Sequence, residues 1–195
     1  MSAFEVEGSE TPAAYFEQRW GSSDDPWEHA RRWSEARKYD LTVATLPGER
    51  YRLALEPACG AGLLTARLAG KADRVNASDR FPEAVAATAE RCRSLANVTA
   101  VVADVRVGPS ERADLVVISE VLYYFDVQLV HELLRTWSAA CEPGGHLALV
   151  HYRPVVPEHV LTGDDVHHVA TVLLGPPRVH VADPDFLLDV HDAGS

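Results

Sequence analysis

Cysteine is scarce in this chain. The 195 residues include three cysteines, Cys59, Cys92 and Cys141, which lie far apart in the sequence. An odd number at such spacings favours neither a disulfide framework nor a metal-binding knuckle. We therefore expect no bound metal and a protein of the reducing cytoplasm.

Positive charge is scarce as well. Lysine and arginine together number 18, against 29 aspartates and glutamates, which gives a formal net charge of -11. A negative field of this kind repels the phosphates of nucleic acids and gives no support to a role at a membrane surface. We expect neither nucleic acid nor membrane as a partner.

Long apolar runs are missing. No stretch approaches the roughly 20 apolar residues that span a bilayer, and no apolar segment typical of a signal peptide follows the acidic first residues. The hydrophobic fraction of 47% is that of an ordinary globular protein. The length suits one α/β domain rather than two.

Short apolar runs alternate with helical patterns through most of the chain. Strands are predicted at residues 52–56, 74–78, 98–102, 115–119 and 146–151, and helices at residues 82–94 and 126–141. Runs such as 115–118 lack polar alternation, which is expected when helices cover both faces of a sheet. Residues 178–182 and 186–191 flank an Asp-Pro pair and predict an antiparallel hairpin. The pattern predicts a single Rossmann-like α/β fold, a doubly wound and mostly parallel sheet of seven strands ending in that hairpin.

The N-terminal part is divided into two segments. Residues 1–24 are predicted to form a tail with a short helix. Residues 25–28 (Asp-Pro-Trp-Glu) combine an N-cap, a proline at the first helical position and a capping-box-like spacing, so a helix is predicted over residues 25–47. Trp20, Trp27 and Trp33 make this segment either a lid over a ligand site or a helix packed against the sheet edge.

The strongest local signal is a turn of small residues after the first predicted strand, at residues 56–62 (Glu-Pro-Ala-Cys-Gly-Ala-Gly). Gly60 and Gly62 allow a sharp turn and a close approach of the backbone to a ligand. A dinucleotide fingerprint would place a small residue where Thr65 stands. The carboxylate of Glu56 would repel a pyrophosphate but suits a cationic ligand such as S-adenosylmethionine. A plain strand-to-helix turn is the alternative.

Two further acidic residues end the next two predicted strands. Asp79 is placed to accept hydrogen bonds from both ribose hydroxyls of an adenosine, or else to cap a helix. Asp104 is placed to accept from an adenine amino group while Val105 packs against the ring, with a purely structural aspartate as the alternative. Three acids at three successive strand ends predict a cofactor site.

Together these residues resemble the class I S-adenosylmethionine-dependent methyltransferases, whose motif is an acidic residue followed by G-x-G-x-G. Ala58 stands at the first glycine of that motif. The resemblance covers the chain from residue 50 onward and implies a methyltransferase domain over residues 25–195 with S-adenosylmethionine as cofactor. The cofactor-binding residues that it implies are Glu56, Ala58, Gly60, Gly62, Asp79, Arg80, Asp104 and Val105.

A narrower resemblance, to the NodS-like N-methyltransferases, lies in residues 25–39, 119–124, 143–147, 151–153, 161–167 and 185–190. Members of that family methylate an amino-sugar nitrogen of a chitooligosaccharide. The resemblance implies a small-molecule acceptor, an amino sugar or another amine. Tyr152 stands where this family suggests a tryptophan.

The acceptor is expected beyond the carboxyl ends of the strands. Glu120 and His151 are the candidates for taking the proton of an amine, and histidine is preferred for its pKa near 6.5. A buried, hydrogen-bonded structural histidine is the alternative for His151, and helix-end packing is the alternative for the tyrosine pair at 123–124. Arg37 and Tyr39 are predicted to hold the methionine end of the cofactor. The predicted acceptor-binding residues are Trp33, Tyr123, Tyr124, Tyr152 and Arg153.

Other functions compete with an N-methyltransferase. An O-methyltransferase of a small metabolite is the nearest rival, and a binding module with a relic fold is another. A nicotinamide-dependent oxidoreductase is disfavoured by Thr65, by Glu56 and by the lack of a Tyr-x-x-x-Lys pair. A metal site is disfavoured for Asp164, His167 and His168. These residues lie at a predicted helix start, where Asp165 is explained as a cap or a partner of the helix dipole.

Overall fold

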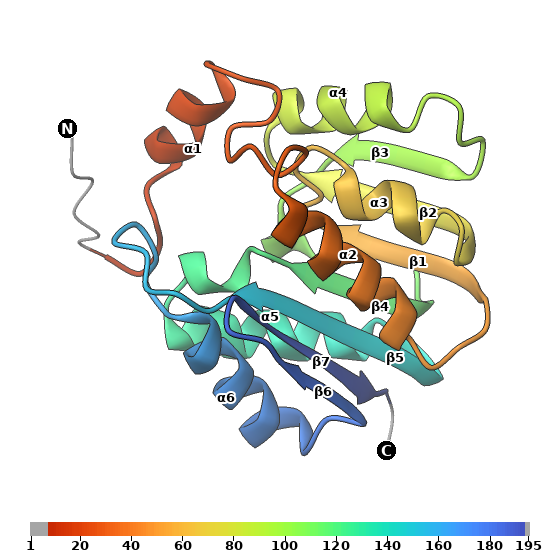
Figure 1. Cartoon of the computed structure of the whole chain (residues 1–195). Coiled ribbons are helices and arrows are strands. Elements are labelled where there is room, and N and C mark those ends of the chain that lie inside the picture. Colours follow the sequence, from red (N-terminus) through yellow and green to blue (C-terminus); the bar gives the residue numbers. More distant parts are fainter. Residues whose placement is uncertain (1–7, 194–195) are drawn as a thin grey trace.

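Seven strands form one twisted sheet between two layers of helices in the computed structural model, which describes residues 8–193 (Figure 1). The strand order is β3-β2-β1-β4-β5-β7-β6. Strands β1 to β5 pair in parallel, whereas β7 runs antiparallel to both β5 and β6. The predicted fold class, including the C-terminal hairpin, is confirmed. Of the predicted tail, residues 1–7 lie outside the described residues.

The strands occupy the segments that the apolar runs predict. Their bounds are β1 Tyr51–Pro57, β2 Ala72–Asp79, β3 Val98–Val102, β4 Ala113–Ser119, β5 Cys141–Tyr152, β6 Val179–Ala182 and β7 Phe186–Asp192. The bounds of the helices are α1 Ala13–Trp20, α2 Trp33–Thr45, α3 Leu63–Leu68, α4 Pro82–Arg91, α5 Val127–Ala139 and α6 Gly163–Leu174, with the 3-10 turns η1 Val105–Val107 and η2 Leu122–Tyr124.

Two apolar cores lie on opposite faces of the sheet. In β4, Val116 and Ile118 join the core under α5 and α6, while Leu115 and Val117 join the core under α2 and α3. Successive side chains of a strand point to opposite faces, so both faces need apolar residues when both are covered. The two covered faces are the reason why the central strands show no polar alternation.

The helix predicted over residues 25–47 begins later than its sequence indicates. The carboxylate of Asp25 accepts hydrogen bonds from the backbone N–H groups of His29 and Ala30, both at 2.9 Å. Glu28 has a φ of 57°, which a right-handed helix cannot contain. Residues 25–32 therefore form a loop, and α2 starts at Trp33.

Within residues 8–193, none of the helices is both long enough and apolar enough to cross a bilayer. The three cysteines are buried and unpaired.

Helix α6 begins with a capping box that anchors the chain after β5. The N–H of Asp165 donates to the hydroxyl of Thr162 at 3.1 Å, and the N–H of Thr162 donates to the carboxylate of Asp165 at 2.9 Å. Thr162 is the N-cap, and Asp165 serves the start of the helix, as predicted, as the N3 residue of the capping box. The box satisfies N–H groups that the first turn of a helix leaves without partners.

We predict that Thr162→Ala lowers the free energy of unfolding by about 1 kcal/mol, because alanine cannot accept the capping hydrogen bond. Urea unfolding at neutral pH measures the change. Thr136→Ala is the matched control, since that hydroxyl only bonds back to the carbonyl of Glu132 in its own helix, and it should change stability by less than about 0.5 kcal/mol. Equal losses in the two variants would contradict the prediction.

Candidate functional site

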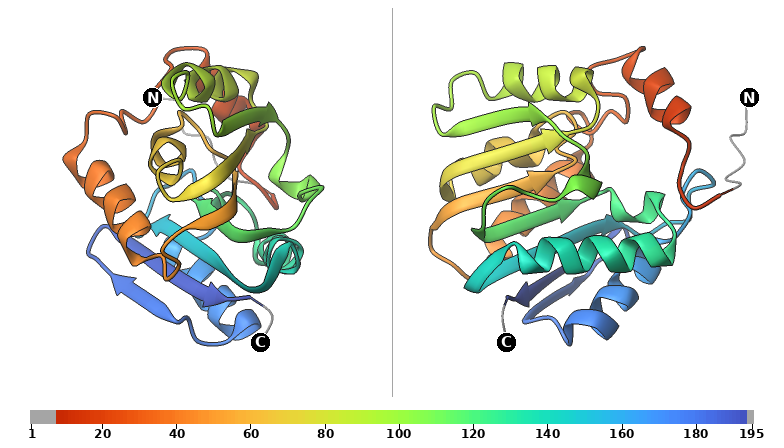
Figure 2. Two further views of the ribbon diagram at one scale, coloured as in Figure 1. Left: turned by 90° about the vertical axis from the view of Figure 1, so that its right-hand side faces the viewer. Right: turned by 180° about the vertical axis from the view of Figure 1, so that it is seen from behind.

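A cavity of about 700 Å³ opens beyond the carboxyl ends of the parallel strands. Helix α1, the loop at residues 23–32 and helix α2 form one side of it, and the turns after β1, β2 and β4 form the other. The arrows of β2 and β3 mark the carboxyl ends of these strands, and Figure 2 shows α1 lying beyond those ends. Parallel α/β sheets bind their ligands at this edge. The predicted N-terminal tail segment therefore contributes to the cavity through α1.

The glycine-rich turn lines this cavity with backbone in left-handed conformation. Gly60 has a φ of 55°, and a Cβ atom placed on it would meet nothing within 4 Å, so its open side faces space. Gly62, with a φ of 73°, packs instead against Thr88, where a Cβ atom would lie 2.8 Å from the hydroxyl oxygen, and it does not line the cavity. Ala58 has a φ of 57° although it carries a Cβ atom. The first position of the motif needs the left-handed turn even with alanine.

Backbone strain is concentrated around the cavity. Across residues 8–193, the non-glycine residues with positive φ are Glu28, Ala58 and Glu120, and all three line the cavity. Each such residue costs roughly 1–2 kcal/mol relative to ordinary backbone. Strain that gathers at one cavity is typical of a functional site.

Glu56 presents a buried carboxyl group to the cavity. Its residue is 3% exposed, and its Oε2 atom has no hydrogen-bond partner among the described residues. Burial raises the pKa of Glu56 to about 8, and the nearby charge of Asp79 adds to the shift. A buried carboxyl oxygen without a partner is costly, so this position calls for a ligand that donates hydrogen bonds or carries positive charge.

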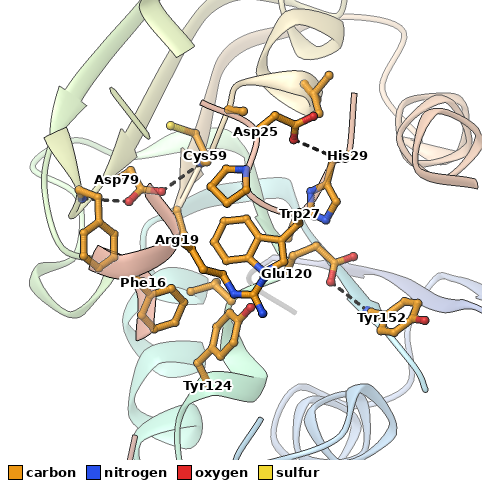
Figure 3. Close-up of a pocket in the computed structure, with 18 of the residues that line it drawn as sticks. Phe16, Arg19, Asp25, Trp27, His29, Cys59, Asp79, Glu120, Tyr124 and Tyr152 are labelled. Carbon is orange, nitrogen blue, oxygen red and sulfur yellow. Dashed lines mark hydrogen bonds between the residues drawn. The ribbon is translucent and has the colours of Figure 1, made fainter. Parts of the chain in front are cut away.

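Asp79, at the end of β2, also lines the cavity (Figure 3). Its two carboxylate oxygens accept hydrogen bonds from the N–H groups of Gly60 and Phe81, each at 3.0 Å. Burial raises the pKa of Asp79, while these N–H groups act in the opposite direction. Each oxygen keeps a lone pair for a ligand hydroxyl, and the turn after β1 is fixed to the tip of β2.

Glu120, at the end of β4, is held in place by three donors. The Lys38 ammonium contacts its Oε1 atom, and its Oε2 atom accepts from the Tyr123 hydroxyl at 2.6 Å and from the Tyr152 N–H at 3.0 Å. Burial opposes ionisation of Glu120, but the Lys38 charge prevails and lowers the pKa to about 2. Lys38 is itself buried and also pairs with Glu35 at 2.6 Å. The ionised Glu120 thus joins α2 to the turn after β4.

His151 lies outside the cavity. It is fully buried, its Nε2 atom accepts from the N–H of Leu122 at 3.4 Å, and its Nδ1 atom bonds to Nε2 of His167 at 3.1 Å. The series of hydrogen bonds continues from His167 to Asp189 at 2.7 Å, and from Asp189 to His180 at 2.6 Å. Burial lowers the pKa of His151 well below its usual range. Both ring nitrogens of His151 are hydrogen-bonded to protein, as expected for a buried structural histidine rather than for the proton acceptor of the amine.

Several other predicted site residues also lie away from the cavity lining. Arg37 pairs with Asp183 at 2.7 Å, and Arg153 pairs with Asp164 at 3.0 Å. Trp33 is 76% exposed. The carboxylate of Asp104 accepts from the backbone and guanidinium of its neighbour Arg106 at 2.6–3.0 Å. The predicted residues that the structure does bring together in the lining are Glu56, Ala58, Gly60, Asp79, Arg80, Val105, Tyr39, Glu120, Tyr123, Tyr124 and Tyr152.

The lining contains residues that the sequence did not single out. His159 stacks on Tyr123 with ring centroids 3.8 Å apart, and burial lowers its pKa to about 4, so it is neutral at neutral pH. Phe16 of α1 lies between Phe81 and Tyr124, at 5.5 and 4.8 Å. Further lining residues without a predicted role include Arg19, His29 and Lys38, and the lining also contains Trp20 and Trp27 of the segment for which a lid was one prediction. The one available signal was the density of aromatic residues in the N-terminal segment.

No group of three or more histidine, cysteine or acidic side chains is arranged to hold a metal ion within the described part of the chain.

Comparisons with known proteins point to one family. A family model described as Nodulation protein S (NodS) matches residues 16–154. The Nodulation protein S of Sinorhizobium fredii (strain NBRC 101917 / NGR234) is 31% identical over 129 residues, covering 65% of this chain and 60% of that protein. The Nodulation protein S of Rhizobium tropici is 33% identical over 129 residues, covering 65% and 54%. This chain therefore spans between 54% and 60% of the length of these relatives.

Solved structures share the fold. A candidate methyltransferase from Pseudomonas syringae is 34% identical with a TM-score of 0.74, and the match covers 83% of this chain and 99% of that one. The N-methyltransferase NodS from Bradyrhizobium japonicum WM9, in complex with S-adenosyl-L-homocysteine, gives a TM-score of 0.78 at 24% identity, covering 93% and 98%. The second match shows a common fold over nearly the whole of both chains.

We predict that Glu56→Gln stabilises the ligand-free protein at neutral and alkaline pH. The pKa of an unfolded glutamate is about 4.3 and that of folded Glu56 is about 8. Between these values the folded state retains a proton that the unfolded state releases, so wild-type stability falls as the pH rises. Glutamine has no such proton, and we expect a gain of about 1–4 kcal/mol near pH 8 that vanishes near pH 4.

Urea unfolding of the two proteins across this pH range measures the difference. The control is Glu142→Gln, because Glu142 is exposed and pairs with Arg52 at the surface. That control should stay within about 0.5 kcal/mol of the wild type at every pH. A stability difference for Glu56→Gln that does not depend on pH would contradict the assigned burial of a protonated carboxyl group.

Proposed function

The chain belongs to the nodulation protein S family, and on this premise we propose that it is an S-adenosylmethionine-dependent methyltransferase acting on an amine of a small molecule, with amino sugars as the acceptor class. The observation that carries the proposal is the buried carboxyl oxygen of Glu56, which faces the cavity without a protein partner beside Asp79. These are the groups that a phosphate-free, positively charged adenosine ligand needs at two adjacent strand ends.

The chemistry of the lining supports this cofactor. Seven acidic side chains line the cavity against four lysines and arginines, which leaves an excess of negative charge. We place the ammonium of the methionine moiety at Glu56, the ribose hydroxyls at Asp79 and the adenine against Val105. Pyrophosphate would meet the buried acid Glu56 and the carboxylate of Asp79, so the same groups disfavour a nicotinamide dinucleotide. Aromatic faces around the cavity stabilise a sulfonium by roughly 0.5–2 kcal/mol each.

Glu120 is the residue that we assign to the acceptor amine. When bound, S-adenosylmethionine supplies a methyl group on sulfur for in-line displacement, so catalysis consists mainly of positioning. With its pKa near 2, Glu120 is ionised at neutral pH and is a weak proton acceptor. It therefore attracts and orients an amine by charge, with the neutral ring of His159, which stacks on Tyr123, as the more basic acceptor for a proton. The cytoplasmic location expected from the sequence stays a prediction.

Direct assay tests the activity. The protein is incubated with S-adenosylmethionine and a panel of chitooligosaccharides that have either a free or an acetylated terminal amine, and products are analysed by mass spectrometry. A methyl group on the free amine alone is the expected result. Methylation of a hydroxyl would favour the O-methyltransferase alternative. Thermal stabilisation by NAD or NADP, with none by S-adenosylhomocysteine, would refute the proposal.

We predict that Asp79→Asn weakens the binding of S-adenosylhomocysteine by about 10- to 100-fold, because charged hydrogen bonds to the ribose are lost. Titration calorimetry measures the Kd. Asp104→Asn is the matched control: its carboxylate is occupied by Arg106 and lies outside the lining, so the Kd should change by less than about 3-fold. A larger loss for Asp104 than for Asp79 would reverse our assignment of the two strand ends.

We predict that Glu120→Gln lowers kcat by about 100-fold, because the acceptor amine loses the charge that orients it. The Kd for S-adenosylhomocysteine should stay within about 3-fold of the wild type, which separates acceptor positioning from cofactor binding. Steady-state kinetics with the acceptor identified in the panel measures kcat, with the exposed α5 variant Glu132→Gln as control. An unchanged kcat would remove Glu120 from the acceptor site.

A further inference from the structure

Arg19 differs from the other cationic side chains of the cavity lining in having no carboxylate partner. Lys38 pairs with Glu35 and Glu120, Arg32 pairs with Glu28 at 3.8 Å, and Arg80 lies 3.7 Å from Asp104. For Arg19, by contrast, the described residues provide neither an ion pair nor a side-chain hydrogen bond. Its positive charge is available to a ligand.

Aromatic rings hold Arg19 in place. It lies in the last turn of α1, with the guanidinium carbon 4.7 Å from the ring centroid of Tyr15 and 5.8 Å from that of Trp27. Figure 3 shows its side chain reaching into the cavity between Trp27 and Tyr124. Contacts with ring faces fix the guanidinium plane without using its N–H donors. The donors of Arg19 are therefore positioned and unoccupied.

The charge of the cavity makes this cation necessary for any anionic ligand group. The lining carries an excess of acidic side chains, and a carboxylate entering it without a cation would be repelled and poorly solvated. The other lysines and arginines of the lining each have an acidic oxygen within 3.8 Å. A guanidinium also matches the fork shape of a carboxylate, which it can bind through two parallel hydrogen bonds.

We propose that Arg19 binds the carboxylate of the cofactor's methionine moiety. The inference rests on the proposed function, because that carboxylate is the one anionic group of S-adenosylmethionine. Glu56 and Asp79 account for the ammonium and the ribose, and no acidic residue can hold the remaining group. Arg37, which the sequence suggested for the methionine end, is bound to Asp183 outside the cavity.

Two ligands that differ only in this carboxylate test the proposal. Titration calorimetry is performed with S-adenosylhomocysteine and with its decarboxylated analogue, 5'-S-(3-aminopropyl)-5'-thioadenosine, on the wild type and on Arg19→Met. We expect the wild type to prefer S-adenosylhomocysteine by about 10- to 100-fold, as a charged hydrogen-bonded pair gives. In Arg19→Met this preference should fall below about 3-fold, with the affinity for the analogue nearly unchanged.

Two further variants complete the test. Arg37→Met is the matched control on α2, and it should keep the wild-type preference because Arg37 lies outside the lining. Arg19→Lys keeps the charge but loses the fork, so it should keep part of the preference. Melting temperatures confirm that each variant is folded.

The outcomes distinguish a failure of the proposed function from a failure of the Arg19 assignment. A wild type that binds neither ligand refutes the proposed function and this inference with it. A wild type that binds S-adenosylhomocysteine, together with an Arg19→Met variant that retains the same preference for it, refutes the assignment of Arg19 alone. Loss of the preference in Arg37→Met rather than in Arg19→Met would likewise overturn the assignment.

Discussion

The parallel pairing of β1, β2 and β4 is the constraint on which the site depends. Parallel strands end at the same edge of a sheet, so Glu56, Asp79 and Glu120 are brought to one cavity although they are far apart in sequence. The apolar side chains on both faces hold these strand ends rigidly. That rigidity allows Ala58 and Glu120 to be kept at positive φ, which isolated turns would relax.

The same cavity keeps its carboxyl groups in different charge states. Glu120 has Lys38 beside it and a pKa near 2, whereas Glu56 has no cation beside it and a pKa near 8. Glu56 is 3% exposed and the Glu120 side chain 13%, so the small difference in exposure does not account for the difference in pKa, and the neighbouring ammonium does. A cationic ligand group at Glu56 would supply the missing charge, and this links the electrostatics of the cavity to the class of ligand that it accepts.

The sequence predicts the strands, the acidic residues at their ends and the glycine turn, because each depends on a local pattern. Unbroken apolar runs indicate strands covered on both faces, and an acid followed by small residues indicates the turn. Which of two neighbouring strand side chains faces the cavity depends on tertiary packing instead. His151 and Tyr152 are neighbours in β5, yet the first points into the core beside α6 and the second lines the cavity. Similarly, the positive φ of Glu28 interrupts, near its start, a helix pattern that looks continuous in the sequence.

Some residues that resemble the NodS-like family lie outside the cavity, and the hydrogen bonds of two buried histidines explain their presence. The N–H of Leu122 donates to Nε2 of His151, so the neutral His151 carries its proton on Nδ1 and donates it to His167, which in turn donates to Asp189. This order fixes both tautomers and joins β5, α6 and β7 to η2, the turn that carries Tyr123. The residues resembling the NodS-like pattern at 151, 167 and 189 thus stabilise the cavity wall that carries Tyr123. These three residues act by position, because none of them lines the cavity.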